Sequence, residues 1–441
     1  MTDMRSSPAV VAAATGAADT IGGATPRVSN LVAITIIGAM FFVFGFVTWL
    51  NGPLISFVKL AFSLSDFEAF LVPMVFYLSY FFLALPAAAI LRRSGLKRGM
   101  VIGLATMAVG TALFGQFATM RLFSGTLCGL FVIGGGLAVL QTAANPYIAI
   151  LGPIESAAQR IAVMGICNKL AGMLAPIAFG LLIMQGVGTL ADRVAVADPA
   201  QRELLLEAFA SQIHWPYLGM AGLLALLAAA VFYSPLPNLA GDGPAGQGGS
   251  VREAWRFRHL RLGVICLFLY MGAEVMAGDA IGLYGDALGL PVEQTAYFAS
   301  LTLAAMLIGY VVGLAVIPRF ISQDRYLALS AVIGMAAVTG SWLSDGYVAV
   351  GFVAALGFAN AMMWPAIFPL AIRDLGRHTE TGSAMLIMAI CGGAIIPQLY
   401  AGLKQVLDFQ LVFLILMVPV YLYILYYALR GHRPADAQQA A

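Results

Sequence analysis

Twelve long apolar runs follow one another along this chain, and each is long enough to cross the apolar core of a bilayer as a helix. With 61% hydrophobic and 10% charged residues, the chain is also too apolar for a soluble protein. The sequence therefore predicts an all-α integral membrane protein with twelve transmembrane helices. They are expected near residues 31–52, 67–90, 99–117, 122–151, 161–187, 215–234, 262–284, 294–318, 326–343, 347–371, 384–403 and 411–429.

The basic residues predict how these helices are oriented. If both termini are cytoplasmic, seventeen of the 23 lysines and arginines lie on the inner side and five on the outer side, with Lys169 inside a span. Loops on the cytoplasmic side of membrane proteins carry such an excess of positive charge. We therefore expect a multi-pass protein with both termini in the cytoplasm.

The chain contains a direct repeat. Leu151-Gly152 recurs as Leu375-Gly376, and M-G-I-C at 164–167 recurs as M-A-I-C at 388–391. Two six-helix halves in parallel arrangement are typical of a secondary transporter whose site lies at the midplane between them. The expected organisation is a disordered cytoplasmic tail at 1–30, an N-terminal six-helix half at 31–234, a cytoplasmic linker at 235–261, a C-terminal six-helix half at 262–430 and a cytoplasmic tail at 431–441.

Other classes of protein find little support in the residues. The four histidines lie at loops or span ends and the four cysteines lack metal-ligand spacing, so we expect no enzyme, no catalytic group, no metal and no cofactor. A net charge of +2 does not indicate a nucleic-acid partner. A channel would need rings of like charge or of carbonyls. A transporter of drugs or of another organic solute stays open, and it would show an apolar, Met-rich cavity.

Polar side chains inside the apolar runs are candidates for a substrate site. A sugar needs amide and carboxylate bonds to adjacent hydroxyls, and an aromatic face against the apolar side of its ring. The alternative for each amide is a hydrogen bond between helices, and Asn145 with Pro146 could instead bend its helix. The candidates are Asn51, Gln141, Asn145, Asn168, Glu274, Asn360 and Trp364, with Trp49, Tyr77, Tyr80 and Tyr284 as further aromatic residues.

Three ionisable side chains inside the runs are candidates for ion coupling, because a charge in a membrane interior is costly. Glu274 is expected near the midplane, and Lys169 lies in the fifth span beside Asn168. Three interpretations, which can coexist, stay open: Lys169 and Glu274 neutralise one another across the two halves, Glu274 titrates as the coupling group, or Glu274 bonds directly to the substrate. Asp279 fits a role at a helix end or in an outer vestibule, with coupling as the alternative.

Several motifs resemble known families. The loop L-R-R-S-G-L-K-R-G at 91–99 resembles the signature loop of the major facilitator superfamily, without its usual acidic residue. Further motifs resemble the fucose:proton symporter family of that superfamily, and within it the bacterial branch for glucose and galactose or N-acetylglucosamine. These are W-L-N at 49–51, L-Q-T-A-A-N-P-Y at 140–147, L-G-P-x-E-S at 151–156 and P-A-I-F-P-L-A-I-R-D-L-G at 365–376.

The resemblance implies the major facilitator fold and a monosaccharide carried across a bacterial inner membrane. Fucose symporters have an aspartate directly after the W-L-N asparagine and a glutamate at the position of Gln141, whereas this chain has Gly52 and Gln141 there. The prediction is uptake of a hexose of the glucose/galactose type by symport with a proton or sodium, through alternating access, by a monomer. The alternatives are an N-acetylglucosamine permease and an uncoupled sugar facilitator.

Overall fold

A computed structural model describes residues 30–150, 157–237, 250–317, 319–375 and 378–433, apart from a few side chains in these ranges, those of Asn145 and Pro146 among them. Every regular element within these ranges is a helix. The expected all-α fold is therefore confirmed.

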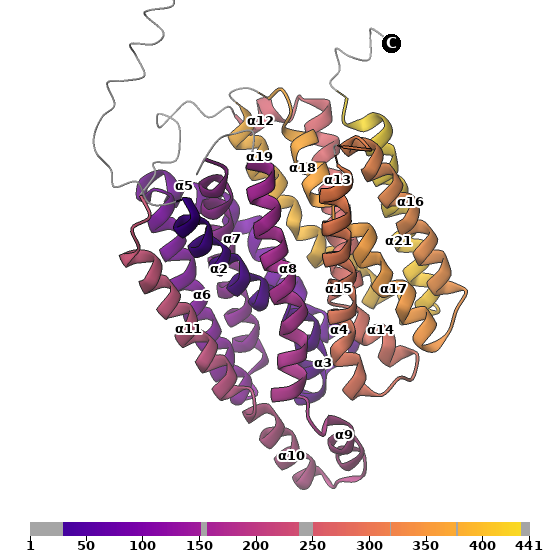
Figure 1. The fold of residues 1–441 in the computed structure, drawn as a ribbon. Helices are drawn as coiled ribbons and strands as arrows, with labels where there is room; N and C mark the ends of the chain where they lie inside the picture. Colours follow the sequence, from indigo (N-terminus) through magenta and orange to yellow (C-terminus); the bar gives the residue numbers. More distant parts are fainter. Residues whose placement is uncertain (1–29, 151–156, 238–249, 318, 376–377, 434–441) are drawn as a thin grey trace, which may run out of the picture.

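The first group of helices, indigo to magenta in Figure 1, is arranged around α6, which packs against both α7 and α11. Helix α5 packs on α7, and α2 packs on α8. The elements are α2 (Asn30–Thr48), α3 (Asn51–Ala61), α4 (Asp66–Ala69), α5 (Leu71–Ser94), α6 (Leu96–Thr119), α7 (Phe123–Ile150), α8 (Ala157–Leu182), α9 (Val187–Val196), α10 (Pro199–Ser211) and α11 (His214–Tyr233).

The second group, orange to yellow in Figure 1, packs α16 against α17 and α21, and α13 against α18 and α20. The elements are α12 (Val251–Ala254), α13 (Arg258–Gly278), α14 (Ile281–Ala287), α15 (Val292–Val316), α16 (Gln323–Trp342), α17 (Gly346–Asn360), α18 (Met363–Ile372), α19 (Thr379–Met388), η3 (Ala389–Cys391), α20 (Gly392–Leu403), α21 (Phe409–Tyr426) and η4 (Tyr427–Gly431).

Within the described ranges, 11 helical segments are long and apolar enough to cross a membrane. The remaining expected span, 326–343, falls on α16, which is less apolar because it begins with Gln323, Asp324 and Arg325. Helix α16 nevertheless packs alongside α17 and α21 over its length. Together with the 11 segments above, α16 completes the expected set of twelve helices of a multi-pass membrane protein.

The two ends of the bundle differ. Helices α9 and α10 project from one end, and α12 lies at the other (Figure 1). Both helices lie between the fifth and sixth expected spans. Asp198 caps α10 by accepting a hydrogen bond of 2.8 Å from the Gln201 amide, and Pro199 occupies the first helical position. We refer to these ends as the α9–α10 end and the α12 end.

Of the expected spans that are broken inside their apolar runs, three break beside polar candidates. The first breaks between α2 and α3 at Trp49 and continues past its expected end at residue 52 as far as Ala61. The seventh breaks at Asp279 between α13 and α14, and the tenth breaks after Asn360 between α17 and α18. A broken helix leaves backbone groups that need partners, and such breaks occur in membranes where protein or a cavity surrounds them. They place the polar candidates Asn51, Asp279 and Asn360 at interruptions of the helices.

The two groups of helices are joined most closely towards the α9–α10 end. There α3 packs against α14 and α15, and α4 packs against α20. Helix α8 packs along α15, and α5 packs against α19, η3 and α20. Among the described residues, α7 makes no comparable packing with α17 or α18. The structure is therefore closed at the α9–α10 end.

Candidate functional site

A buried ion pair joins the two groups of helices. Lys169 on α8 lies 2.6 Å from Glu274 on α13, measured from Nζ to Oε1, and the two side chains are only 9% and 8% exposed. An unpaired charge at this depth would cost several kcal/mol, about the penalty expected for a buried ion. The structure thus answers the question of pairing: each residue neutralises the other.

Trp49 fills the space beside this pair, at the break between α2 and α3. The Lys169 ammonium lies 4.3 Å from the centroid of the indole ring, in the range of a cation–π contact. The ring is enclosed by two glycines: a Cβ atom on Gly172 would lie 2.4 Å from one ring carbon, and one on Gly278 would lie 2.5 Å from another. The indole Nε1 also points at Asn168 Oδ1, at 3.4 Å. Trp49 therefore connects α8 to α13 by packing, next to the charges.

Asp279 lies directly after α13 and is 1% exposed. The Tyr77 hydroxyl of α5 donates to Asp279 Oδ2 at 3.0 Å. Gly52 of α3 packs on its backbone, because a Cβ atom at residue 52 would lie 3.2 Å from the Asp279 Cα atom. Asp279 is thus at a helix end, as expected, but it is buried between the helix groups rather than facing an outer vestibule. We call the contact of Trp49, Gly52 and Tyr77 with Gly278 and Asp279 the seam.

The amide candidates whose side chains the structure describes are buried or half-buried, and two of them keep unused donors. The Tyr421 hydroxyl donates to Asn360 Oδ1 at 2.8 Å, while Asn360 Nδ2 has no hydrogen-bond partner among the described residues. The same holds for Asn51 Nδ2. Gln141 Nε2 donates to the Tyr80 hydroxyl at 3.0 Å. Buried polar atoms are nearly always bonded, so an unused donor is a place where a water molecule or a substrate hydroxyl would bind.

The remaining candidates have contacts that do not involve the ion pair, or lie outside the described residues. Trp364 stacks on Phe368 with ring centroids 5.8 Å apart, so one face of its indole is already covered. The side chain of Asn145 and the motif at 151–156 lie outside what the structure describes. Tyr284 bonds to Ser341 at 2.6 Å, away from the ion pair.

Sequence reasoning missed three tyrosines that surround the ion pair together with Tyr77. Tyr270, Tyr310 and Tyr421 are buried and lie within electrostatic range of Glu274. A tyrosine in an apolar run carries no signal that separates a site residue from a packing residue. These buried tyrosines add phenol groups to the surroundings of Glu274.

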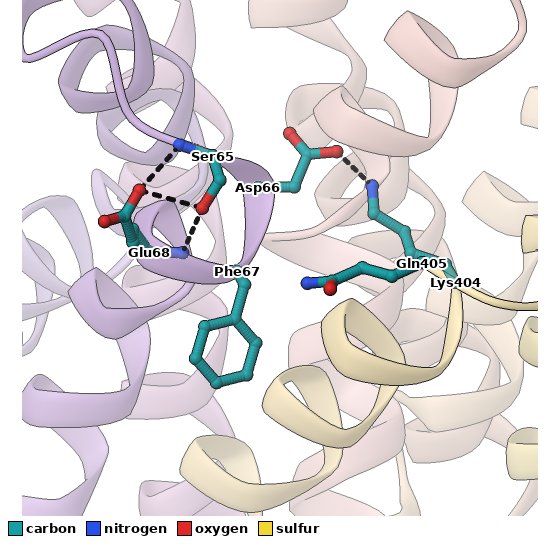
Figure 2. A pocket seen from close by; sticks show the side chains of 6 residues that line it. All are labelled: Ser65, Asp66, Phe67, Glu68, Lys404 and Gln405. Atoms are coloured by element: carbon teal, nitrogen blue, oxygen red, sulfur yellow. Dashed lines mark hydrogen bonds and ion pairs between the residues drawn. The ribbon is translucent and has the colours of Figure 1, made fainter.

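A second group of charges lies at the α9–α10 end. Lys59 of α3 bonds to Asp66 at 2.7 Å and to Asp286 of α14 at 3.0 Å, and Asp66 also bonds to Lys404 after α20 at 2.5 Å. Figure 2 shows the Asp66–Lys404 contact beside a surface hollow of about 600 Å³. None of the candidate residues lines this hollow, whose lining is Ser65, Asp66, Phe67, Glu68, Lys404 and Gln405. We call Lys59, Asp66, Asp286 and Lys404 the outer ion network.

Comparison with known proteins adds the following. The family model described as Major Facilitator Superfamily matches residues 37–398. A protein of Brucella abortus named glucose/galactose transporter is 34% identical over 406 residues, which is 91% of this chain and 94% of the relative. The L-fucose-proton symporter of Escherichia coli is 29% identical over 376 residues, 83% of this chain and 86% of the relative. The fold is also similar to a crystal structure of a transporter named FucP in the outward conformation, with a TM-score of 0.73 and 26% sequence identity. The match covers 92% of this chain and 99% of the FucP chain.

Proposed function

This chain belongs to the major facilitator superfamily, a family of membrane transporters rather than enzymes, and from that membership we propose that it takes up a monosaccharide by symport with a cation. The proposed substrate is a hexose of the glucose/galactose type. The observation that carries this proposal is the buried Lys169–Glu274 ion pair between the two helix groups. The buried amide donors of Asn51 and Asn360, which have no hydrogen-bond partner among the described residues, support it.

The proposed substrate site combines hydroxyl-binding groups from both helix groups. Asn51, Gln141 and Asn168 come from the first group, and Glu274 and Asn360 from the second. The unused Nδ2 donors of Asn51 and Asn360 suit the oxygen atoms of a sugar, and the Gln141 carbonyl can accept from a hydroxyl. Asn145 and Trp364 stay in the proposed set on the strength of the sequence motifs.

The proposed coupling groups are Lys169, Glu274 and Asp279. They are ionisable, buried and close to the interface, where a change in contact between the helix groups changes their surroundings. Gly52 and Gln141 stand where fucose symporters carry carboxylates, so these three residues are the ionisable groups available for this task.

Alternating access also needs an orientation and two moving bodies. We place the α12 end in the cytoplasm and the α9–α10 end outside, in a bacterial inner membrane, because the basic residues concentrate towards the α12 end. The proposed moving bodies are the halves 31–234 and 262–430, joined by the linker at 235–261, in a monomer. Closure at the α9–α10 end corresponds to a state closed to the outside.

The experiment for the substrate is counterflow into proteoliposomes that are preloaded with one sugar and given no ion gradient. Labelled glucose or galactose should exchange with unlabelled hexose inside. Exchange of N-acetylglucosamine in preference to both would establish the alternative permease. If no monosaccharide exchanges while an apolar organic solute does, the sugar proposal is wrong.

One observation favours a second candidate, an uncoupled facilitator. Lys169 and Glu274 already neutralise one another, so the pair alone needs no ion from solution. A facilitator would exchange sugar in the same counterflow assay and would fail to accumulate it against a gradient.

A further inference from the structure

We propose that Asp279 is the group that binds the driving proton from the outside, and that its burial in the seam makes proton binding a condition for closing the α9–α10 end. This inference rests on the proposed symport and names the residue and the ion that carry it. It follows from where Asp279 lies, what contacts it and which charges are left for it.

Asp279 belongs to the second helix group, but its contacts in the seam come from the first. Tyr77 of α5 donates to its carboxylate, and Gly52 of α3 packs on its backbone. Trp49 covers the preceding residue, Gly278. If α3 and α5 separate from α13 at the α9–α10 end, Asp279 loses all three neighbours and becomes accessible from that end. Opening therefore changes the carboxyl group from buried to hydrated.

The charges around Asp279 do not provide a cation for it. Helix α13 contributes Glu274, α8 contributes Lys169, and α5 contributes the neutral Tyr77. From α3, Gly52 packs on Asp279 and carries no charge. The lysine of α3, Lys59, is already bonded within the outer ion network. Lys169 is bonded to Glu274 at 2.6 Å. An ionised Asp279 in the closed seam would thus be a buried charge without a cation of its own.

A bound proton removes this cost. Burying an unpaired carboxylate is expensive, whereas a carboxylic acid is neutral and can still bond to Tyr77. In the outward-open state, a carboxylate oxygen of Asp279 takes a proton from a hydronium ion outside: one O–H bond of the hydronium breaks, an O–H bond forms on the carboxyl group, and a water molecule is left. After closure and opening at the α12 end, that O–H bond breaks and the proton passes to water on the cytoplasmic side. One positive charge moves with each sugar.

The same neighbours favour a proton over sodium. Tyr77 directs a hydroxyl donor at Asp279 Oδ2, and Asp279 Oδ1 has no hydrogen-bond partner among the described residues. Donors stabilise a carboxylate but are not ligands for a metal cation, which needs oxygen lone pairs. Among the described contacts, the side-chain group directed at the carboxylate is a donor, which suits a proton site.

Glu274 has a distinct part in this scheme. It holds the Lys169 ammonium, and so it prevents that ammonium from neutralising Asp279 in place of a proton. The pair is therefore a positioning element for coupling, and Asp279 is the group that carries the proton.

The test is sugar transport by proteoliposomes reconstituted with the full chain, either wild type or Asp279→Asn. Asparagine has the size of a protonated aspartate and cannot release a proton. We expect the variant to keep counterflow, to lose pH dependence of that exchange, and to lose accumulation under an imposed proton gradient. The matched control is Asp286→Asn on α14, which also faces the first helix group but is bonded to Lys59 and is 38% exposed. It should still accumulate sugar.

The variant Tyr77→Phe provides a second test through the pH midpoint of transport, which a purely structural role of Tyr77 would leave unchanged. It removes the donor to Asp279 and keeps the ring, so the pH midpoint of transport should shift towards higher pH with little change in maximal exchange. An unchanged pH profile would contradict a role for the Tyr77–Asp279 contact in proton binding.

The outcomes separate the inference from the function on which it rests. If wild type accumulates sugar and Asp279→Asn does so equally, the inference is wrong and symport stands. If a sodium gradient drives accumulation and a proton gradient does not, the inference is also wrong. If wild type accumulates no sugar under either gradient, symport itself fails and the inference fails with it.

Discussion

The Lys169 ammonium and the Glu274 carboxylate meet 2.6 Å apart across the interface between α8 and α13. Each charge comes from a different helix group, so the pair forms only where the two groups are in contact. Its neighbours are the indole of Trp49 and, within electrostatic range, Asp279. Three ionisable groups thus share a small buried volume that any movement of the helix groups must rearrange.

Removing Lys169 should destabilise the protein more than removing Glu274. Lys169→Met leaves the buried Glu274 carboxylate without its cation, and we expect a loss of about 3–5 kcal/mol, the range for breaking a buried pair. Glu274→Gln should cost less, because the freed Lys169 can approach Asp279. The double variant Lys169→Met/Glu274→Gln should be more stable than the sum of the single effects predicts. Unfolding of the purified protein in detergent measures all three, and strict additivity would show that the residues do not interact.

Adding a methyl group at Gly278 should hinder closure of the seam. A Cβ atom there would lie 2.5 Å from the Trp49 ring, and overpacking of this kind costs about 1–3 kcal/mol. We expect Gly278→Ala to lower the uptake rate by roughly tenfold, which corresponds to about 1.4 kcal/mol. Gly351→Ala on α17 is the control, because a Cβ atom at residue 351 meets nothing within 4 Å. Equal uptake by the two variants would contradict the packing argument.

Substitutions at two neighbouring residues of α7, Gln141 and Thr142, should differ in their effect on the KM for sugar. Gln141→Ala removes an amide that bonds to Tyr80 across to α5, whereas Thr142→Ala removes a hydroxyl that bonds only to the Ala138 carbonyl of its own helix. We expect Gln141→Ala to raise the KM for sugar by roughly tenfold or more, since a hydrogen bond to a substrate is worth about 1–2 kcal/mol. Counterflow at several sugar concentrations measures this. A larger effect of Thr142→Ala would exclude Gln141 from the site.

The outer ion network should favour the closed α9–α10 end. Lys59, Asp66 and Asp286 are partly exposed, so the two bonds of Lys59 contribute about 0.2–1 kcal/mol each and are weakened by salt. Lys404 is only 8% exposed, so its bond to Asp66 is screened less. Asp66→Asn removes two of these bonds and should shift the protein towards states open at this end. Spin labels at Glu68 and Gln405, on opposite sides of the hollow in Figure 2, would show a longer distance in the variant and in high salt.

The control for this experiment is Asp345→Asn, which changes an exposed acid at the start of α17. It should leave the distance between the labels as in wild type. If Asp66→Asn also leaves that distance unchanged, the network does not hold the α9–α10 end closed.

The membrane fold could be predicted from the sequence because apolar run length decides it. Each run of this length must form a helix, since no other open structure satisfies its backbone in lipid. The breaks at Trp49, Asp279 and Ala361 could not be predicted in the same way. Hydropathy averages over a window and does not detect one or two residues that leave helical hydrogen bonding, so α2 and α3 were expected as one shorter span.

The candidate site could be predicted in its residue types but not in its contacts. Polar and ionisable residues in apolar runs point to Glu274, Lys169 and Asp279 because burying them is costly. Which of them meet depends on packing between helices that are far apart in sequence. Gly52 illustrates the difference: the sequence shows only a missing carboxylate there, whereas the structure shows that residue packed on Asp279.

The most direct measurement is accumulation of labelled hexose by proteoliposomes with an imposed proton or sodium gradient, comparing wild type with Glu274→Gln, and counterflow as the control for folding. Coupling through the buried charges predicts that wild type concentrates sugar when the proton gradient is imposed. Glu274→Gln should lose accumulation, because Lys169 is then free to replace the proton at Asp279, while exchange persists at a higher KM because Glu274 also belongs to the proposed sugar site. If wild type only equilibrates hexose under both gradients, cation symport is contradicted and the protein is a facilitator.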